Sequence, residues 1–412
     1  MRIAVLGSGG REHALSWRLR REGHEVVTFP GAPGIPGSES GVSLDDPNRL
    51  SEALGGFGAE LVVIGPEAPL ARGLADELRA RGSTVLGPGS EAARLETSKL
   101  FAKKFMVRHG VKTPAFIEAT DPAAARVALP QLESPVVKFD GLAAGKGVFV
   151  CADREEALRA LELIEVRHGK DAPVVLEERL AGREVSVLAV VGGGRCVLLP
   201  PAQDHKRLRD GDQGPNTGGM GAVCPVAWLD SDGLSAITRD VVEPTLEGLL
   251  AEGIELRGVL YFGLMMTEAG PRLLEYNVRF GDPEAQVVLH RAGGSLAPVF
   301  LHAASAPGGR VVEVTRHPAE PGFTVGVVLA SEGYPDQPRG GDLVTGLENC
   351  ELVFHAGTTK TADGWVTSGG RVVLIAGAGA TLREARAVAY AEVSKVRFRG
   401  MQLRRDIGGG SS

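Results

Sequence analysis

The sequence is poor in cysteine and in aromatic residues, and these shortages argue against a disulfide-rich or zinc-dependent protein. Only 5% of its 412 residues are Phe, Trp or Tyr. The four cysteines stand far apart, at Cys151, Cys196, Cys224 and Cys350. Zinc sites and disulfide frameworks need cysteines at paired spacings. The pattern therefore predicts a reduced protein of the cytoplasm.

Long hydrophobic runs and basic blocks are also missing. No apolar run approaches the roughly 20 residues that cross a membrane. Met1 leads directly into the strand-like "RIAVLG", which does not resemble a signal peptide. The formal net charge is −6, and no basic block carries the interleaved aromatic residues of a nucleic-acid-binding surface. We therefore expect neither a membrane nor a nucleic acid as a partner.

The chain has the composition of an ordinary globular protein, with 43% hydrophobic and 23% charged residues. Up to about residue 95, β-rich runs alternate with helical stretches, which predicts a parallel α/β domain. Segments that turn at 192–194 and 269–271 predict antiparallel hairpins in the middle of the chain. After residue 305, short strands closed by a helix that starts at Thr381 predict a β-rich unit.

The expected fold class is therefore α/β and α+β. The expected domains are 1–98, a parallel α/β unit; 99–305, a central unit of mixed sheets with a subdomain at about 120–185; 306–408, a small α+β unit rich in β-strands; and 409–412, a flexible tail.

The segment "VLGSGGREHAL" places glycines between an apolar strand and a helix. Gly9 and Gly10 suggest a dinucleotide fingerprint, but Glu12 stands where that fingerprint needs a small residue. A glycine-rich turn that opens a helix still presents backbone N–H groups to a single phosphate, and Arg11 adds a donor. We interpret the turn as a phosphate site, with a simple tight turn as the alternative. Glu67, in "GPEAPL", is expected at the same edge of the sheet.

The segment "LLEYNVRFGDPE" is the most informative in the chain. In a strand, Glu275, Asn277 and Arg279 point to one face, and Leu274 lies on the other. Magnesium takes hard oxygen ligands from one or two protein groups and the rest from water and phosphates, while arginine binds phosphate oxygens. The row predicts a site for a metal-bound polyphosphate. The alternative is a solvated strand face with an ion pair.

Three further segments are candidates for binding. In "KFDGLAAGKG", small residues let backbone amides approach phosphates, and Lys146 adds charge; a flexible hairpin is the alternative. Glu177 and Glu184 lie near a strand end, where carboxylates accept hydrogen bonds from adenine or ribose, although surface glutamates are common. The polar segment 202–222 is too long for a tight turn and favours binding. His205, within it, is expected to be a positioning or exposed group.

These segments, together with "FHAGT" and "RRDIG", occur in an order that resembles the glycinamide ribonucleotide synthetase family of the ATP-grasp superfamily, the phosphoribosylamine–glycine ligases. The resemblance spans nearly the whole chain. It implies two ATP-grasp subdomains that hold ATP between two sheets, with Mg²⁺ or Mn²⁺ as the metal. It also implies a reaction in which glycine is activated as glycyl phosphate and joined to 5-phosphoribosylamine. The expected partners are these small molecules, and the expected state is a monomer.

The resemblance also implies a role for individual residues. The catalytic residues would be Arg279 and Lys146, and the metal ligands Glu275 and Asn277. The ATP site would contain Lys103, Lys138, Gly145, Lys146, Gly147, Glu177 and Leu180 at the adenine hinge, and Glu184 at the ribose. The substrate site would contain Gly9, Gly10, Arg11, Glu67, Asp204, Lys206, Asn216, Gly218, Gly219, Met220 and Arg279.

Two readings compete with this one. Another ATP-grasp ligase of purine synthesis is disfavoured by "GSGGREHAL" and "QDHKR". A nucleotide-binding module without catalysis would be expected to lack Glu275, Asn277 or Lys146, and the chain has all three. The chain departs from the family pattern at Phe139 and at the pair 223–224.

Overall fold

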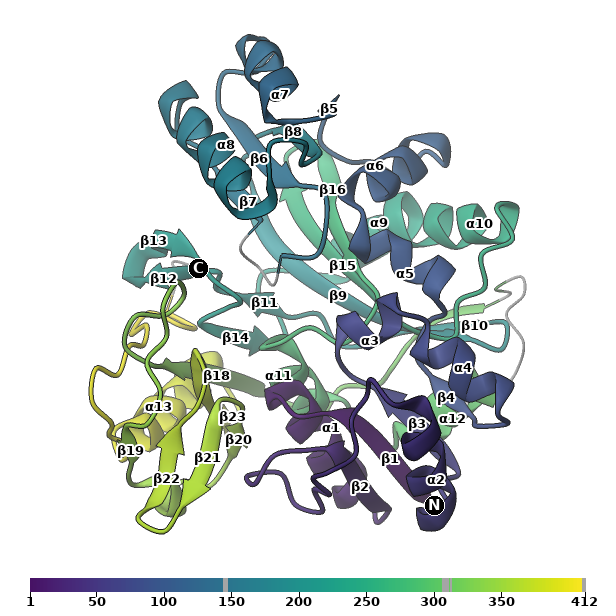
Figure 1. Cartoon of the computed structure of the whole chain (residues 1–412), viewed down its shortest axis with the longest axis vertical. Coiled ribbons are helices and arrows are strands. Elements are labelled where there is room, and N and C mark those ends of the chain that lie inside the picture. Colours follow the sequence, from purple (N-terminus) through teal and green to yellow (C-terminus); the bar gives the residue numbers. More distant parts are fainter. Residues whose placement is uncertain (144–146, 306–310, 312, 410–412) are drawn as a thin grey trace.

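The computed structural model describes residues 1–143, 147–305, 311 and 313–409. Its N-terminal part is a parallel sheet covered by helices (Figure 1). The strands are β1 (Arg2–Gly7), β2 (Glu25–Pro30), β3 (Leu61–Ile64) and β4 (Val85–Leu86), in the order β2-β1-β3-β4. The helices are α1 (Gly10–Arg21), α2 (Pro47–Phe57), α3 (Glu67–Ala71), α4 (Leu74–Ala80) and α5 (Ser90–Thr97). The strands read as continuous apolar runs because both faces of the sheet are buried.

The central sheet has the order β16-β15-β9-β10-β17. Its strands are β9 (Arg183–Gly192), β10 (Arg195–Leu198), β15 (Gly258–Thr267), β16 (Gly270–Asn277) and β17 (Glu313–Arg316). The same part of the chain contains the helices α6 (Lys99–Arg108), α9 (Ser231–Ile237), α10 (Glu243–Ala251), α11 (Glu284–Arg291) and α12 (Ala297–Ser305). All its pairings are antiparallel except that of β10 with β17, so the expected hairpins β9–β10 and β15–β16 are confirmed.

A smaller antiparallel sheet, called here the upper sheet, stands at the top of Figure 1. Its strands are β5 (Phe116–Ala119), β6 (Pro135–Phe139), β7 (Val148–Val150) and β8 (Val174–Glu178), in the order β5-β8-β6-β7. Helices α7 (Pro122–Ala128) and α8 (Arg154–His168) pack against it and enclose an apolar core of their own.

The C-terminal sheet combines strands from two distant parts of the chain. Its order is β11-β14-β18-β23-β20, from β11 (Gln203–Asp204), β14 (Gly221–Cys224), β18 (Phe323–Ala330), β20 (Val353–His355) and β23 (Arg371–Gly379). Helix α13 (Leu382–Val393) packs on this sheet, and α11 also contacts it. The segment 202–222 begins and ends in this C-terminal sheet, although it precedes the domain boundary expected near residue 305. Conversely, β17 follows that boundary but pairs with β10 in the central sheet.

Short elements complete the fold. They are the hairpin β12 (Arg207–Arg209) and β13 (Gln213–Asn216), the sheet of β19 (Leu343–Val344), β22 (Gly364–Thr367) and β21 (Thr358–Thr361), 3₁₀ turns at Leu129–Gln131, Asp210–Asp212 and Leu347–Asn349, and a π turn at Thr238–Val242.

Helix ends follow the expected capping chemistry. The Ser98 hydroxyl accepts a hydrogen bond from Phe101 N at the start of α6, and Thr381 caps α13 together with Glu384. The mixed α/β class expected from the sequence is confirmed. No helix among the described residues has both the length and the apolar character needed to cross a bilayer.

Candidate functional site

Two cavities adjoin where the central sheet, the upper sheet and the N-terminal sheet come together. The larger cavity, of about 1290 Å³, is lined by β6, β7, residues 177–184 and the segment 203–207. The smaller one, of about 340 Å³, is lined by residues of the N-terminal domain, of β16 and of the turn that follows β16. Asp204, Lys206, Asn216 and Glu275 line both cavities. Most of the predicted site residues thus lie around one junction.

Strand β16 carries the expected row of polar residues, with one correction. Glu275 and Asn277 both line the smaller cavity and are partly exposed, whereas Tyr276 borders the same cavity but is buried. Leu274, expected on the opposite face of the strand, instead lines both cavities. The reason is a β-bulge: Gly263 pairs with Glu275 and the next residue of β15 pairs with Leu273, which leaves Leu274 as the extra residue. Leu273 takes the core position and is fully buried.

Arg279 lies beyond the end of β16, which stops at Asn277. It nevertheless lines the same cavity as Glu275 and Asn277. The alternation expected for a continuous strand therefore stops at Asn277, and the turn beyond it places the guanidinium.

The electrostatics around Glu275 suit a cation ligand. Burial alone would raise the pKa of its carboxyl group, but the ammonium groups of Lys206, Lys138 and Lys99 lower that pKa to about 2. Lys206 Nζ lies 3.6 Å from Glu275 Oε1 and 3.2 Å from Glu184 Oε2. An ionised carboxylate beside the amide of Asn277 supplies the hard oxygen atoms that magnesium or manganese takes from a protein.

Within the described ranges, no group of three or more His, Cys, Asp or Glu residues is arranged to hold a metal by itself. A cation at Glu275 and Asn277 would therefore need further ligands from water or a bound phosphate. That coordination is the usual one for magnesium in nucleotide-dependent enzymes.

Lys103, Lys138 and Glu177 form a buried ionic cluster. Glu177 lies 3.1 Å from Lys103 Nζ and 2.7 Å from Lys138 Nζ, and the three side chains are at most 5% exposed. Burial lowers the pKa of Lys103 to about 8, against the opposing effect of Glu177. The Glu177 carboxylate is therefore engaged by both lysines. Glu177 and Leu180, the residues that the resemblance implies at the adenine hinge, both line the larger cavity.

Gly145 and Lys146 lie outside the described residues. Gly147 lines the smaller cavity, next to the start of β7. Phe139, one of the departures from the family pattern, stacks on His168 with 3.8 Å between ring centroids. A Cβ atom on Gly141 would lie 2.5 Å from its ring, so the phenyl group fills the space beside that glycine.

The segment 202–222 divides into residues that face the cavities and residues that do not. Asp204, Lys206, Asn216 and Gly218 line one or both cavities. Met220 is fully buried in a small apolar cluster with Leu208 and Ala330, so its side chain points away from the expected substrate site. Gly219 packs on the ring of Pro283, where a Cβ atom would come within 2.4 Å. Burial raises the pKa of Asp204 well above its ordinary value, against the pull of Lys206.

Glu12 explains the glycine-rich turn at the N-terminus. Its carboxylate accepts a hydrogen bond from Gly9 N at 2.6 Å and forms an ion pair with Arg11 Nε at 2.6 Å. A Cβ atom on Gly7 or Gly65 would lie 2.4 Å or 2.0 Å from atoms of Glu12. These two glycines make room for a buried carboxylate, which is why the sequence departs from a dinucleotide fingerprint here.

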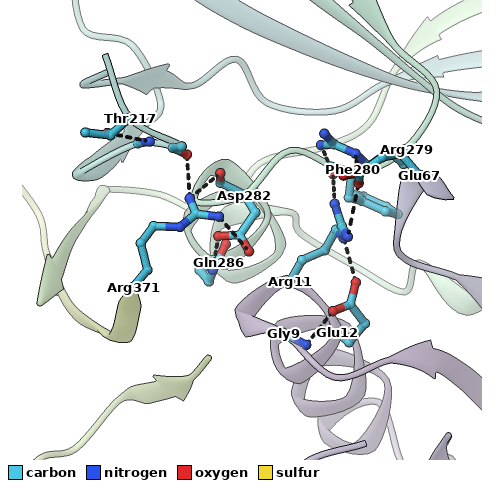
Figure 2. A network of polar contacts seen from close by, with 12 residues as sticks. Gly9, Arg11, Glu12, Glu67, Thr217, Arg279, Phe280, Asp282, Gln286 and Arg371 are labelled. Carbon is cyan, nitrogen blue, oxygen red and sulfur yellow. Dashed lines mark hydrogen bonds and ion pairs between the residues drawn. The ribbon is translucent and has the colours of Figure 1, made fainter. Parts of the chain in front are cut away.

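A chain of alternating charges, called here the charge ladder, runs from this turn to Arg279. It consists of Glu12, Arg11, Glu67, Arg279 and Glu96. Figure 2 shows Arg11 between Glu12 and Phe280, with Arg279 and Glu67 beside them. Burial would lower the pKa of Arg279, but Glu96 and Glu67 raise it, so the guanidinium is a permanent cation. Gly9 and Gly10 line neither cavity, whereas Arg11 and Glu67 line the smaller one.

Sequence reasoning missed several residues of the site. Arg371, on β23, donates from Nη1 to the carbonyl oxygens of Asp282, at 2.7 Å, and of Gly218 (Figure 2). The hydroxyl group of Tyr334 accepts a hydrogen bond from Gly218 N at 2.9 Å. The C-terminal unit thereby fastens the segment 217–219 to the turn after Arg279. Asp282 belongs to the motif "LLEYNVRFGDPE" that the sequence analysis singled out. Nothing in the sequence around Arg371, Tyr334 or Glu96 indicated that these three residues contact the site.

Comparison with known proteins places this geometry in one family. Models of phosphoribosylglycinamide synthetase match along the chain: its N domain over residues 1–96, its ATP-grasp (A) domain over 97–285 and its C domain over 324–410. The phosphoribosylamine–glycine ligase of Caulobacter vibrioides is 44% identical to the chain, over 98% of the chain and 97% of its own length.

Solved structures give the same result. The crystal structure of phosphoribosylamine–glycine ligase from Thermotoga maritima matches with a TM-score of 0.85 and 39% identity, over 99% of this chain and 100% of the other. A biotin carboxylase domain from Hydrogenobacter thermophilus, crystallised with MgADP and bicarbonate, matches with a TM-score of 0.71 and 17% identity, over 98% of this chain and 91% of the other. The second likeness concerns the fold alone.

Proposed function

The chain belongs to the phosphoribosylglycinamide synthetase family and is accordingly an ATP-dependent ligase of purine biosynthesis, and we propose that it joins glycine to 5-phosphoribosylamine through glycyl phosphate. An oxygen of the glycine carboxylate attacks the γ-phosphorus of ATP, the bond from that phosphorus to ADP breaks, and ADP leaves. The amine of phosphoribosylamine then attacks the acyl carbon. Phosphate leaves, the nitrogen loses a proton, and glycinamide ribonucleotide remains.

One observation carries this proposal: the ionised carboxylate of Glu275, the amide of Asn277 and the guanidinium of Arg279 line one cavity. That cavity adjoins a larger one, which lies beside buried lysines. The first step brings an anionic carboxylate to an anionic triphosphate. Preorganised cationic groups offset that repulsion and stabilise the charge of the transition state. Positive charge of this kind comes from Lys103, Lys138 and Arg279. Their side chains are already held in place, so they need not reorient as solvent water would.

In this proposal ATP occupies the larger cavity. Its base lies near Leu180 and its ribose near Glu184, and its phosphates extend toward Lys138, Lys103 and Gly147. The positions of residues 177–184 along the cavity wall support this arrangement. Glu275 and Asn277 would hold Mg²⁺ or Mn²⁺, which when bound neutralises phosphate charge.

The smaller cavity would receive glycine and phosphoribosylamine. Arg11 and Glu67 from the N-terminal domain line it beside Arg279, and Gly218 lines another part of its wall. Arg11 provides a cation for the substrate phosphate near the turn at Gly9 and Gly10. Asp204, Lys206 and Asn216 lie between the two cavities, where the reacting groups would meet.

The test is the substrate dependence of ADP release. With phosphoribosylamine generated in situ from ribose 5-phosphate and ammonia, we expect ADP release to require glycine, phosphoribosylamine and Mg²⁺ together. Equal release of ADP with carboxylates of any kind refutes the substrate assignment.

The intermediate, glycyl phosphate, is tested separately. Hydroxylamine added to the complete mixture of glycine, phosphoribosylamine and MgATP is expected to trap glycine hydroxamate, and the absence of the hydroxamate during turnover argues against glycyl phosphate.

The proposal includes a monomer that works in the cytoplasm. The buried, unpaired cysteines Cys151, Cys196 and Cys224 support a reducing compartment. Light scattering after size exclusion is expected to give a mass near 43.1 kDa, and a mass of twice that value would contradict the monomer.

A further inference from the structure

Glu96 lies at the end of α5, in the N-terminal part of the chain, yet both its carboxylate oxygens contact the turn that follows β16. Oε1 lies 2.9 Å from Arg279 Nη2, and Oε2 accepts a hydrogen bond from Val278 N at 2.8 Å. The residue is 7% exposed. One side chain therefore holds both the guanidinium of Arg279 and the backbone that carries it.

Arg279 has a second carboxylate partner of different character. Glu67 Oε2 lies 3.0 Å from Arg279 Nε, and its side chain is 29% exposed, against 6% for Glu96. Glu67 also faces Arg11 at 3.9 Å. The guanidinium is thus held between two carboxylates whose residues both line the smaller cavity, one almost fully buried and the other partly exposed.

We propose that Glu96 is a positioning residue for Arg279, fixing the plane of the guanidinium while Glu67 is the partner that substrate can draw away. This inference rests on the proposed function, in which Arg279 stabilises charge that develops during phosphoryl transfer. A free arginine side chain loses rotamer entropy when it is ordered. An anchor at both the guanidinium and the backbone removes that freedom before the reaction begins.

The chemistry of the anchor requires a carboxylate. Both contacts of Glu96 are made by donors, Arg279 Nη2 and Val278 N, so both side-chain oxygens must accept. In Glu96→Gln one of these acceptors becomes an NH₂ group that faces a donor. The substitution keeps the volume and shape of the side chain, so its main effect falls on the aim of Arg279.

The test compares Glu96→Gln in two backgrounds. In the otherwise wild-type enzyme we expect kcat to fall about 10- to 100-fold, since displacement of a reacting or stabilising group by about 1 Å costs up to roughly 100-fold. The dissociation constant of MgATP, measured by calorimetry, should stay within about twofold. In an Arg279→Met background, the same substitution should change kcat less than about threefold, because the group it positions is gone.

Matched controls separate positioning from folding. Glu91→Gln changes an exposed glutamate of the same helix, and should leave kcat and the melting temperature unchanged. If Glu96→Gln fails to fold, Glu96→Asp takes its place, because it keeps the charge but draws the oxygens back from both donors.

The same loss of kcat in both backgrounds, or a loss of MgATP affinity as large as the loss of kcat, overturns the role of Glu96. Wild-type enzyme without glycine-dependent turnover overturns the proposed function, and this inference with it.

Discussion

Lys206 and Glu275 face each other where the two cavities meet, with the ammonium nitrogen 3.6 Å from a carboxylate oxygen. The same ammonium group lies 3.2 Å from Glu184. Burial would lower the pKa of Lys206, but Glu184, Asp204 and Glu275 raise it well above its ordinary value. Lys206 therefore offsets part of the negative charge of the carboxylates that line this junction.

The first prediction concerns the metal ligand. Glu275→Ala should lower kcat by at least about 100-fold, because a preorganised stabilising group is lost from the transition state. The fold should survive, since Lys206 keeps Glu184 as a partner. ADP release and circular dichroism measure the two effects. Glu313→Ala, at the exposed edge of the same sheet, is the control and should match wild type. Wild-type rates from Glu275→Ala would rule out the metal role.

The second prediction concerns the buried cluster at Lys103. Glu177→Ala leaves the ammonium groups of Lys103 and Lys138 buried without their carboxylate, so we expect a loss of about 3–5 kcal/mol in the free energy of unfolding. The exposed pair Lys104–Glu118, at 2.7 Å, is the comparison. Its removal by Lys104→Met should cost less than about 1 kcal/mol. Urea titration measures both values, and equal losses would show that burial of the cluster does not matter.

The third prediction tests the packing of Glu12. Gly65→Ala would drive a Cβ atom to 2.0 Å from the Glu12 carboxylate, and we expect it to cost about 1–3 kcal/mol of stability. Glu12→Ala should cost about 1–3 kcal/mol because Gly9 N loses its acceptor. The double variant should lose clearly less than the sum, since removal of the carboxylate makes room for the new methyl group. Additive losses in urea unfolding would contradict this explanation of the glycine.

The fourth prediction concerns acid stability. Burial, followed by the effect of His355, lowers the pKa of His13 from 6.5 to about 3. Below pH 6.5 the unfolded chain binds a proton that the folded protein does not, so stability falls as the pH drops from 6.5 toward 3. By pH 5 this residue alone should account for about 2 kcal/mol.

A variant isolates that contribution. His13 Nδ1 accepts a hydrogen bond from His355 N at 2.9 Å, and the side-chain oxygen of an asparagine can take over this role. His13→Asn should therefore show a smaller loss of unfolding free energy between pH 6.5 and 5 than wild type. Identical slopes for the two proteins would locate the acid sensitivity elsewhere.

Local patterns in the sequence predicted those parts of the site that depend on local geometry. The alternation along β16 placed Glu275 and Asn277 in one cavity, and Thr381 marked the start of α13. The bulge at Leu274 was not predictable in the same way, because it depends on how β16 registers against β15. Glu12 was read as a departure from a fingerprint, since the space it fills is made by glycines at positions 7 and 65, far apart in the chain.

The contacts of Glu96, Arg371 and Tyr334 join segments separated by 89 to 182 positions in the sequence. Such pairings follow from how whole sheets are placed, which no short pattern encodes. The family resemblance supplied the chemistry of the site, and the arrangement of the sheets supplied the residues that support it.

The placement of β14 in the C-terminal sheet has a consequence for the newly made protein. The segment 205–220 leads into β14, but β18, the strand that pairs with β14, is synthesised much later. Tyr334 and Arg371 are synthesised after β18. A ribosome-bound chain that has just exposed Glu275 therefore still lacks the partners that hold one wall of the substrate cavity. We expect competence to use a substrate as short-lived as phosphoribosylamine to arise only after Arg371 has been synthesised and has reached its partners.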